Sequence, residues 1–86
     1  MNNVIYRARL RLGGNDYTEW YWDTRAEAAD WLNHVIQDRK RKGLYCGGPR
    51  IEAVPVAACE TAFDYNYENI PRIISERRKA HEAIRD

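Results

Sequence analysis

The residue types that most often catalyse reactions or hold metals are scarce in this sequence. The sulfur and imidazole side chains are Cys46, Cys59, His34 and His81. No pair of them has the C-x-x-C or H-x-x-x-H spacing that zinc sites use, so we expect neither a metal site nor a cofactor. Cys46 lies in the stretch GLYCGGP, which has no feature that predicts an activated thiol, and we interpret it as a loop cysteine.

The acidic residues and glycines do not form a catalytic pattern either. Carboxylates are numerous, but none lies in an apolar stretch that would tune it as a general acid or base. The pair Gly47-Gly48 does not belong to a phosphate-binding loop, because G-x-x-x-x-G-K-[ST] does not occur in the sequence. We therefore predict that the protein is not an enzyme.

Two basic groups are candidates for contacts with nucleic-acid phosphates. The first lies on one face of a predicted strand, and the second occupies the last turn of a predicted helix. The alternative is that both groups are solvated charges, the first partly neutralised by Glu19, Tyr21 and Asp23. The first group is Arg7, Arg9 and Arg11, and the second is Arg39, Lys40, Arg41 and Lys42.

An acidic segment rich in aromatic residues is the second candidate surface. The stretch from Ile51 to Pro71 contains four acidic residues and neither Lys nor Arg. Its acids alternate with aromatic rings, a composition that suits a protein-binding patch directed at a basic surface. In the alternative, the rings fold inward to complete a small core. The candidate partner-binding residues are Glu60, Asp64, Tyr65, Tyr67 and Glu68.

The size and composition of the chain limit the kind of fold that can position these residues. The 86 residues suffice for one domain, spanning residues 1–86, and the net charge of +1 argues against a strongly basic nucleic-acid binder. The longest apolar run, Ala53 to Cys59, has seven residues, whereas a membrane span needs roughly 20. Two cysteines and no apparent leader predict a cytoplasmic location with reduced thiols.

The N-terminal part predicts a β-hairpin. Val4 to Leu12 alternates apolar and basic residues, Gly13 to Asp16 is a turn, and Tyr17 to Trp22 is a second strand. A two-residue loop would place arginines opposite Trp20 and Trp22. We favour a three-residue loop, which puts both tryptophans in the core, with Leu10 opposite Trp20 and Ala8 opposite Trp22. Tyr21 is then exposed and lies over Arg9.

Helices and a third strand follow. Thr24 and Glu27 form a capping box that starts a helix, and Gly43 ends it. Arg50 to Ala57 predicts a third strand, at a sheet edge or bulge because Pro55 cannot donate a ladder hydrogen bond. Cys59 to Asn69 is compatible with an edge strand, a helical turn or an ordered loop. A final helix begins near Asn69 and Pro71. Its thin apolar stripe is Ile70, Ile73, Ile74, Ala80 and Ile84.

These elements predict an α+β fold in the order ββαβα. In outline the chain resembles the small phage-encoded inhibitors of bacterial defence systems, anti-CRISPR proteins among them. The features that carry the resemblance are the length, the Gly-Gly-Asn-Asp turn followed by Thr-x-x-Glu and a helix, and the segregated acidic segment. The resemblance implies stoichiometric binding to a host effector, with Glu60, Asp64 and Glu68 occupying a surface that normally holds phosphates.

Three hypotheses for function follow. The first is a non-enzymatic inhibitor that binds a host protein, such as a nucleic-acid-binding effector complex, through the acidic and aromatic segment. The second is a nucleic-acid-binding module that uses the two basic groups. The third is a structural homodimer formed through Ile73 and Ile84.

Overall fold

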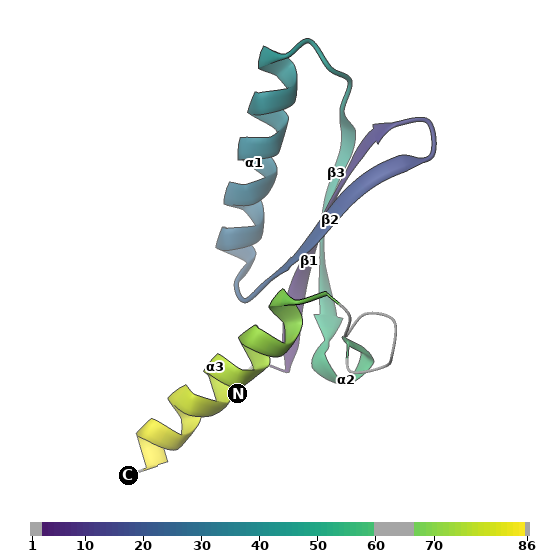
Figure 1. The fold of residues 1–86 in the computed structure, drawn as a ribbon. Coiled ribbons are helices and arrows are strands. Elements are labelled where there is room, and N and C mark those ends of the chain that lie inside the picture. The colour runs from purple at the N-terminus through teal and green to yellow at the C-terminus, as the bar shows by residue number, and fades with distance from the viewer. Residues whose placement is uncertain (1–2, 60–66, 86) are drawn as a thin grey trace.

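The fold combines one three-stranded antiparallel sheet with helices on both of its faces (Figure 1). The computed structural model describes residues 3–59 and 67–85. Within them the strand order is β2-β1-β3, so β1 is central. The elements are β1 (Val4–Gly13), β2 (Asp16–Trp22), α1 (Arg25–Arg41), β3 (Gly47–Pro55), α2 (Val56–Cys59) and α3 (Asn69–Arg85). The predicted α+β class and ββαβα outline are confirmed, with the short α2 as an addition.

The alternation of β1 gives the sheet two different faces. On one side Ala8 and Leu10 are fully buried, and they pack against α1. On the other side Ile5 is fully buried among residues of α2 and α3. The strand therefore has apolar contacts on both faces at its start, whereas near the hairpin turn one face is covered by none of the described helices.

The hairpin turn differs from our prediction. Gly14 and Asn15 form a two-residue loop, with Gly13 opposite Asp16. Both glycines have a positive φ, 128° for Gly13 and 54° for Gly14, which residues with a β-carbon rarely adopt. The register then shifts between Arg11 and Gly13, because one extra residue is inserted in β1 as a β-bulge.

The shorter loop and the bulge each move the register by one position, so the predicted register is wrong by two positions. Leu10 pairs with Thr18 instead of Trp20, and Ala8 pairs with Trp20 instead of Trp22. A two-residue loop alone would have turned both tryptophans to the wrong side of the sheet. With the extra residue, even-numbered residues of β1 again pair with even-numbered residues of β2. Our prediction from tryptophan burial therefore placed Trp20 and Trp22 on the correct side of the sheet but opposite the wrong partners.

Tyr21 is the clearest error in the predicted hairpin. We expected an exposed ring over Arg9, but Tyr21 is only 1 % exposed and lies opposite Arg7. It belongs to the cluster beneath α3. Trp20 and Trp22, which we expected in the core, are only half-buried. Trp22 lies beside Trp31 of α1, with the ring centroids 6.1 Å apart. The prediction assumed a solvated outer face, whereas α3 covers this end of it.

Local signals set both ends of α1. The Thr24 hydroxyl accepts a hydrogen bond from the backbone N–H of Glu27 at 3.2 Å, as the capping box predicts. At the other end, Gly43 has a φ of 69° and its N–H donates to the carbonyl of Lys40. The N–H of Leu44 donates to the carbonyl of Arg39, which completes a Schellman motif. The predicted helix boundaries are confirmed.

β3 is an edge strand, as the proline in its sequence predicted. It pairs only with β1 among the described strands, and Pro55 is its last residue, opposite Val4. The strand begins at Gly47 rather than Arg50 and ends before the predicted Ala57, because Val56 starts α2. The earlier start extends the pairing to Arg11 opposite Gly47.

α3 packs on the sheet through its first half only. Ile70 is fully buried, Ile73 is nearly so, and Arg77 donates to the Asp23 carboxylate with an Nε–Oδ1 distance of 2.6 Å. Residues 78–83 are exposed, and this part of the helix projects away from the sheet (Figure 1). Ile73, one of the two residues of the homodimer hypothesis, therefore lies inside the chain's own core.

Candidate functional site

The face of the sheet opposite α1 changes character along its length. At one end it carries Ile5, Tyr21 and Val54, which are buried beneath α2 and α3. Toward the hairpin turn the same face carries arginines, and in the register Arg9 of β1 lies beside Arg50 of β3. We call this second part the open sheet face and define it as Arg9, Arg11, Tyr17, Gly48 and Arg50.

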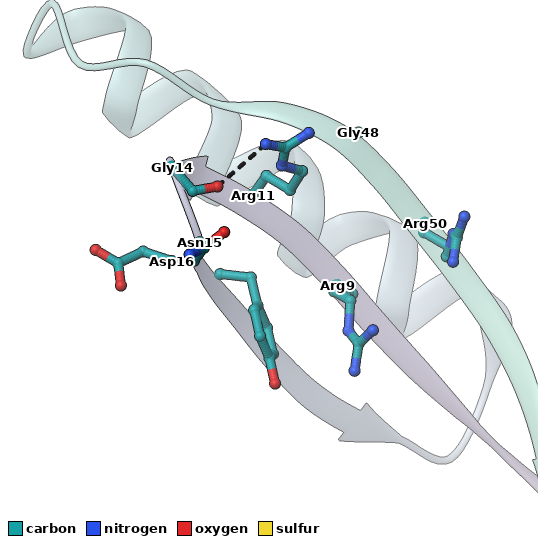
Figure 2. Close-up of a pocket in the computed structure, with 8 residues that line it drawn as sticks. Arg9, Arg11, Gly14, Asn15, Asp16, Gly48 and Arg50 are labelled. Carbon is teal, nitrogen blue, oxygen red and sulfur yellow. Dashed lines mark hydrogen bonds between the residues drawn. The ribbon is translucent and has the colours of Figure 1, made fainter.

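The open sheet face surrounds a shallow hollow of about 500 Å³. Arg9, Arg11 and Arg50 line it from two neighbouring strands, while the Asp16 carboxylate points away from them (Figure 2). Among the lining residues that the structure describes, Asp16 is the one acid. The hollow therefore has an excess of positive charge, which suits an anionic ligand. Its lining residues are Arg9, Arg11, Gly14, Asn15, Asp16, Tyr17, Gly48 and Arg50.

Among the three arginines of the open sheet face, Arg11 and Arg50 have the guanidinium groups that are freest to bind a ligand. Arg11 is exposed and donates to the carbonyl of Gly14 at 3.1 Å. The side chain of Arg50 is 64 % exposed, and its contact with the Glu52 carboxylate is long, at 3.4 Å. A guanidinium has five N–H donors, so one such contact leaves several donors for a ligand.

Arg9 is held in place by a chain of polar contacts. Its Nε and one terminal nitrogen donate to Oε2 of Glu19 at 3.0 and 2.9 Å. The other oxygen of Glu19 accepts from the Tyr67 hydroxyl at 2.6 Å. The side chain of Glu19 is only 9 % exposed, so this carboxylate links the core to the open sheet face. Arg9 thus keeps a fixed position, 4.6 Å above the centre of the Tyr17 ring.

The hydrogen bond to Glu19 also changes the acidity of Tyr67. Because the bond favours the neutral phenol and burial adds to this, the pKa of Tyr67 is raised to about 12. The unfolded chain, with a tyrosine pKa near 10, loses this proton first. The stabilisation is therefore complete below pH 10 and is lost as the pH rises from about 10 to about 12.

This pH dependence can be measured with Tyr67→Phe. At pH 8 the variant should unfold about 1 kcal/mol more easily, because it lacks the hydrogen bond to Glu19. Between pH 8 and pH 11.5 the difference in unfolding free energy from the wild type should shrink by on the order of 1 kcal/mol, since solvent screens a half-buried group. Urea unfolding at both pH values gives the two differences. Equal differences would contradict the assigned role of Glu19.

Arg7 has a structural role, although the sequence grouped it with Arg9 and Arg11. Its guanidinium lies 2.7 Å from the Glu52 carboxylate and donates to the Tyr21 hydroxyl at 3.4 Å. The hydrogen bond from Arg7 lowers the pKa of Glu52. The side chain is 22 % exposed, and its Nε is buried. Arg7 therefore lies at the boundary between the core and the open sheet face, with its guanidinium engaged by Glu52 and Tyr21.

The second predicted basic group is not joined to the first. It ends α1, which lies on the other side of the sheet. Arg39 ties down the following loop by donating to the carbonyl of Tyr45 at 2.7 Å and to that of Leu12 at 3.2 Å. Lys42 pairs with Asp38 at 3.0 Å. Lys40 and Arg41 are exposed.

Arg50 is the residue that the search for basic groups missed. It follows Pro49 and stands alone among apolar and acidic neighbours in the sequence. The signal that it belongs with Arg9 was available only through the register of β3 against β1. Arg50 already began the predicted third strand, but only the antiparallel pairing of that strand with β1 places Arg50 beside Arg9.

The acidic and aromatic segment is described only in part. Tyr67 is half-buried and packs against the rings of Trp20 and Tyr21, with centroid distances of 6.1 and 5.1 Å. It therefore contributes to the chain's own packing. Glu68 is exposed and lines a hollow of about 400 Å³ with Trp20, Asn69 and Arg72. The predicted partner-binding residues Glu60, Asp64 and Tyr65 lie outside the described residues.

The cysteines and histidines are dispersed. Cys59 is buried in the core beneath α3, and Cys46 is half-buried beside the α1 cluster. His34 is exposed and bonds through Nδ1 to the carbonyl of Asp30 at 2.9 Å. In residues 3–59 and 67–85, no group of three or more His, Cys, Asp or Glu residues is placed to hold a metal ion.

No helix in the described part of the chain is long and apolar enough to cross a membrane. Comparison of the chain with protein-family models, with curated proteins and with solved structures found no match.

Proposed function

We propose that the protein binds nucleic acid through its open sheet face. The observation that carries the proposal is the side-by-side placement of Arg9, Arg11 and Arg50 around one hollow. Arginine presents several donors in a planar fork that matches the oxygens of a phosphate group. Phosphate contacts of this kind supply most of the affinity in sequence-independent binding.

The expected interaction is weak and depends on salt. Arg11 and Arg50 offer about two phosphate contacts, because Arg9 is already paired with Glu19. Two contacts correspond to a slope of about −1.4 to −1.8 in a plot of log affinity against log salt. The near-neutral net charge of +1 adds little long-range attraction, so binding depends on this local cluster.

A salt titration tests the proposal. Fluorescence anisotropy of labelled mixed-sequence DNA and RNA should report binding that weakens about tenfold between about 50 and 200 mM salt. A dissociation constant at the weak end of non-specific binding, up to about 100 μM, is compatible with two contacts. Absence of binding at that protein concentration at the lower salt, to either nucleic acid, would refute the proposal.

A second candidate function is binding to a host protein through the acidic and aromatic segment, as an inhibitor of the anti-CRISPR kind. The observation that favours it is the hollow where the exposed Glu68 lies beside the half-buried Trp20. Tryptophan is enriched among residues that anchor protein interfaces, and a carboxylate beside it suits a basic side chain of a partner. This hollow and the open sheet face share no residues.

A further inference from the structure

We propose that the open sheet face selects single-stranded nucleic acid and stacks one base on Tyr17. This inference rests on the proposed function, and it specifies the form of nucleic acid that the same site accepts. It is carried by an aromatic ring that stays exposed in the middle of the arginine cluster, with one arginine fixed against it.

Tyr17 has the position that a base-stacking residue needs. It lies in β2 opposite Arg11, and it lines the same hollow as Arg11 and Arg50. Its side chain is among the most exposed large rings of the described residues, and the residue is 53 % exposed. A phosphate bound by Arg11 therefore brings its own or a neighbouring nucleotide close to the ring.

Arg9 prepares the ring for this role. Its guanidinium lies 4.6 Å from the ring centroid, and the two bonds to Glu19 prevent it from swinging away. Both a tyrosine ring and a guanidinium plane are surfaces on which bases stack. Since Glu19 is also bonded to Tyr67, the stacking surface is preorganised by contacts that reach into the core.

The geometry favours a single strand over a duplex. In a duplex the faces of the bases are occupied by their neighbours, and only base edges and phosphates are accessible. A duplex would therefore contact Arg11 and Arg50 but leave the Tyr17 ring without a partner. An unstacked base in a single strand can use the ring and the arginines together, so the difference between the two forms should depend on Tyr17.

The test compares three labelled probes by anisotropy at about 50 mM salt. They are oligothymidylate, the same strand with abasic sites, and a blunt mixed-sequence duplex. The wild type should bind oligothymidylate at least about fivefold more tightly than the abasic strand, which keeps the phosphates but has fewer bases to stack. It should also bind oligothymidylate more tightly than the duplex.

Two variants locate the effect on the ring. Tyr17→Ala should lose at least about fivefold in affinity for oligothymidylate and little for the duplex, whereas Tyr17→Phe should keep the preference because the ring remains. Circular dichroism of both variants checks the fold. The abasic comparison uses the wild type alone, so it stays decisive if Tyr17→Ala fails to fold.

The two proposals fail in different ways. Equal binding of all three probes, unchanged by Tyr17→Ala, would overturn the single-strand inference and leave nucleic-acid binding intact. Absence of binding to every probe would overturn both. A preference for the duplex would also overturn the inference, and it would point to phosphate contacts alone.

Discussion

Replacing Arg11 and Arg50 together with glutamate is expected to weaken nucleic-acid binding at least about tenfold. The variant removes the two guanidinium groups that are freest on the open sheet face and puts two carboxylates in their place. Each carboxylate repels a phosphate where an arginine attracted one, so the salt dependence of the remaining binding should also become shallower. Anisotropy titrations at several salt concentrations measure both effects.

A matched control is available on α3. Arg78→Glu with Lys79→Glu changes the net charge by the same amount as the double variant on the open sheet face. Both residues are exposed, and their part of α3 projects away from the sheet at the end opposite the hairpin turn (Figure 1). If the local cluster is the site, this variant should bind nearly as well as the wild type. A similar loss in both variants would mean that net charge alone is responsible, and the site assignment would be wrong.

The Ile70→Ala variant is expected to lose about 2 to 5 kcal/mol of unfolding free energy. Ile70 is fully buried between α3 and the sheet, in the cluster that also holds Ile5 and Tyr21. Truncation leaves a cavity that α3 can fill only by moving toward the sheet. Since small domains have only about 5 to 15 kcal/mol of stability, the loss is a large fraction of the total. Urea unfolding followed by tryptophan fluorescence measures it.

Ile74→Ala is the comparison for this variant. It removes the same atoms from the next turn of the same helix, but Ile74 is only half-buried. Its expected cost is about 1 kcal/mol, because less apolar surface is returned to water. If the two variants cost the same, Ile70 is not the anchor that holds α3 on the sheet.

Local patterns in the sequence determined the elements and the direction in which most of them face. The two-residue period of β1, the capping box at Thr24 and the left-handed glycine Gly43 each depend on contacts within a few residues. Such contacts can be predicted from residues that are neighbours in the sequence, because the backbone geometry of strands, caps and turns is the same in every fold. The α+β class followed from their order.

Contacts between distant residues decided the site, and these were not readable locally. A loop of two residues and one inserted residue in β1 together moved the strand partners from Arg11 back to Tyr6 two positions from the predicted register. α3 buried Tyr21, which the strand pattern alone placed in solvent. The register of β3 brought Arg50 to Arg9, while α1 carried the Arg39–Lys42 group to the other side of the sheet. The physical reason is that strand register and helix placement minimise the apolar area that the whole chain exposes to water. That area depends on contacts between distant residues, so a short stretch of sequence does not determine it.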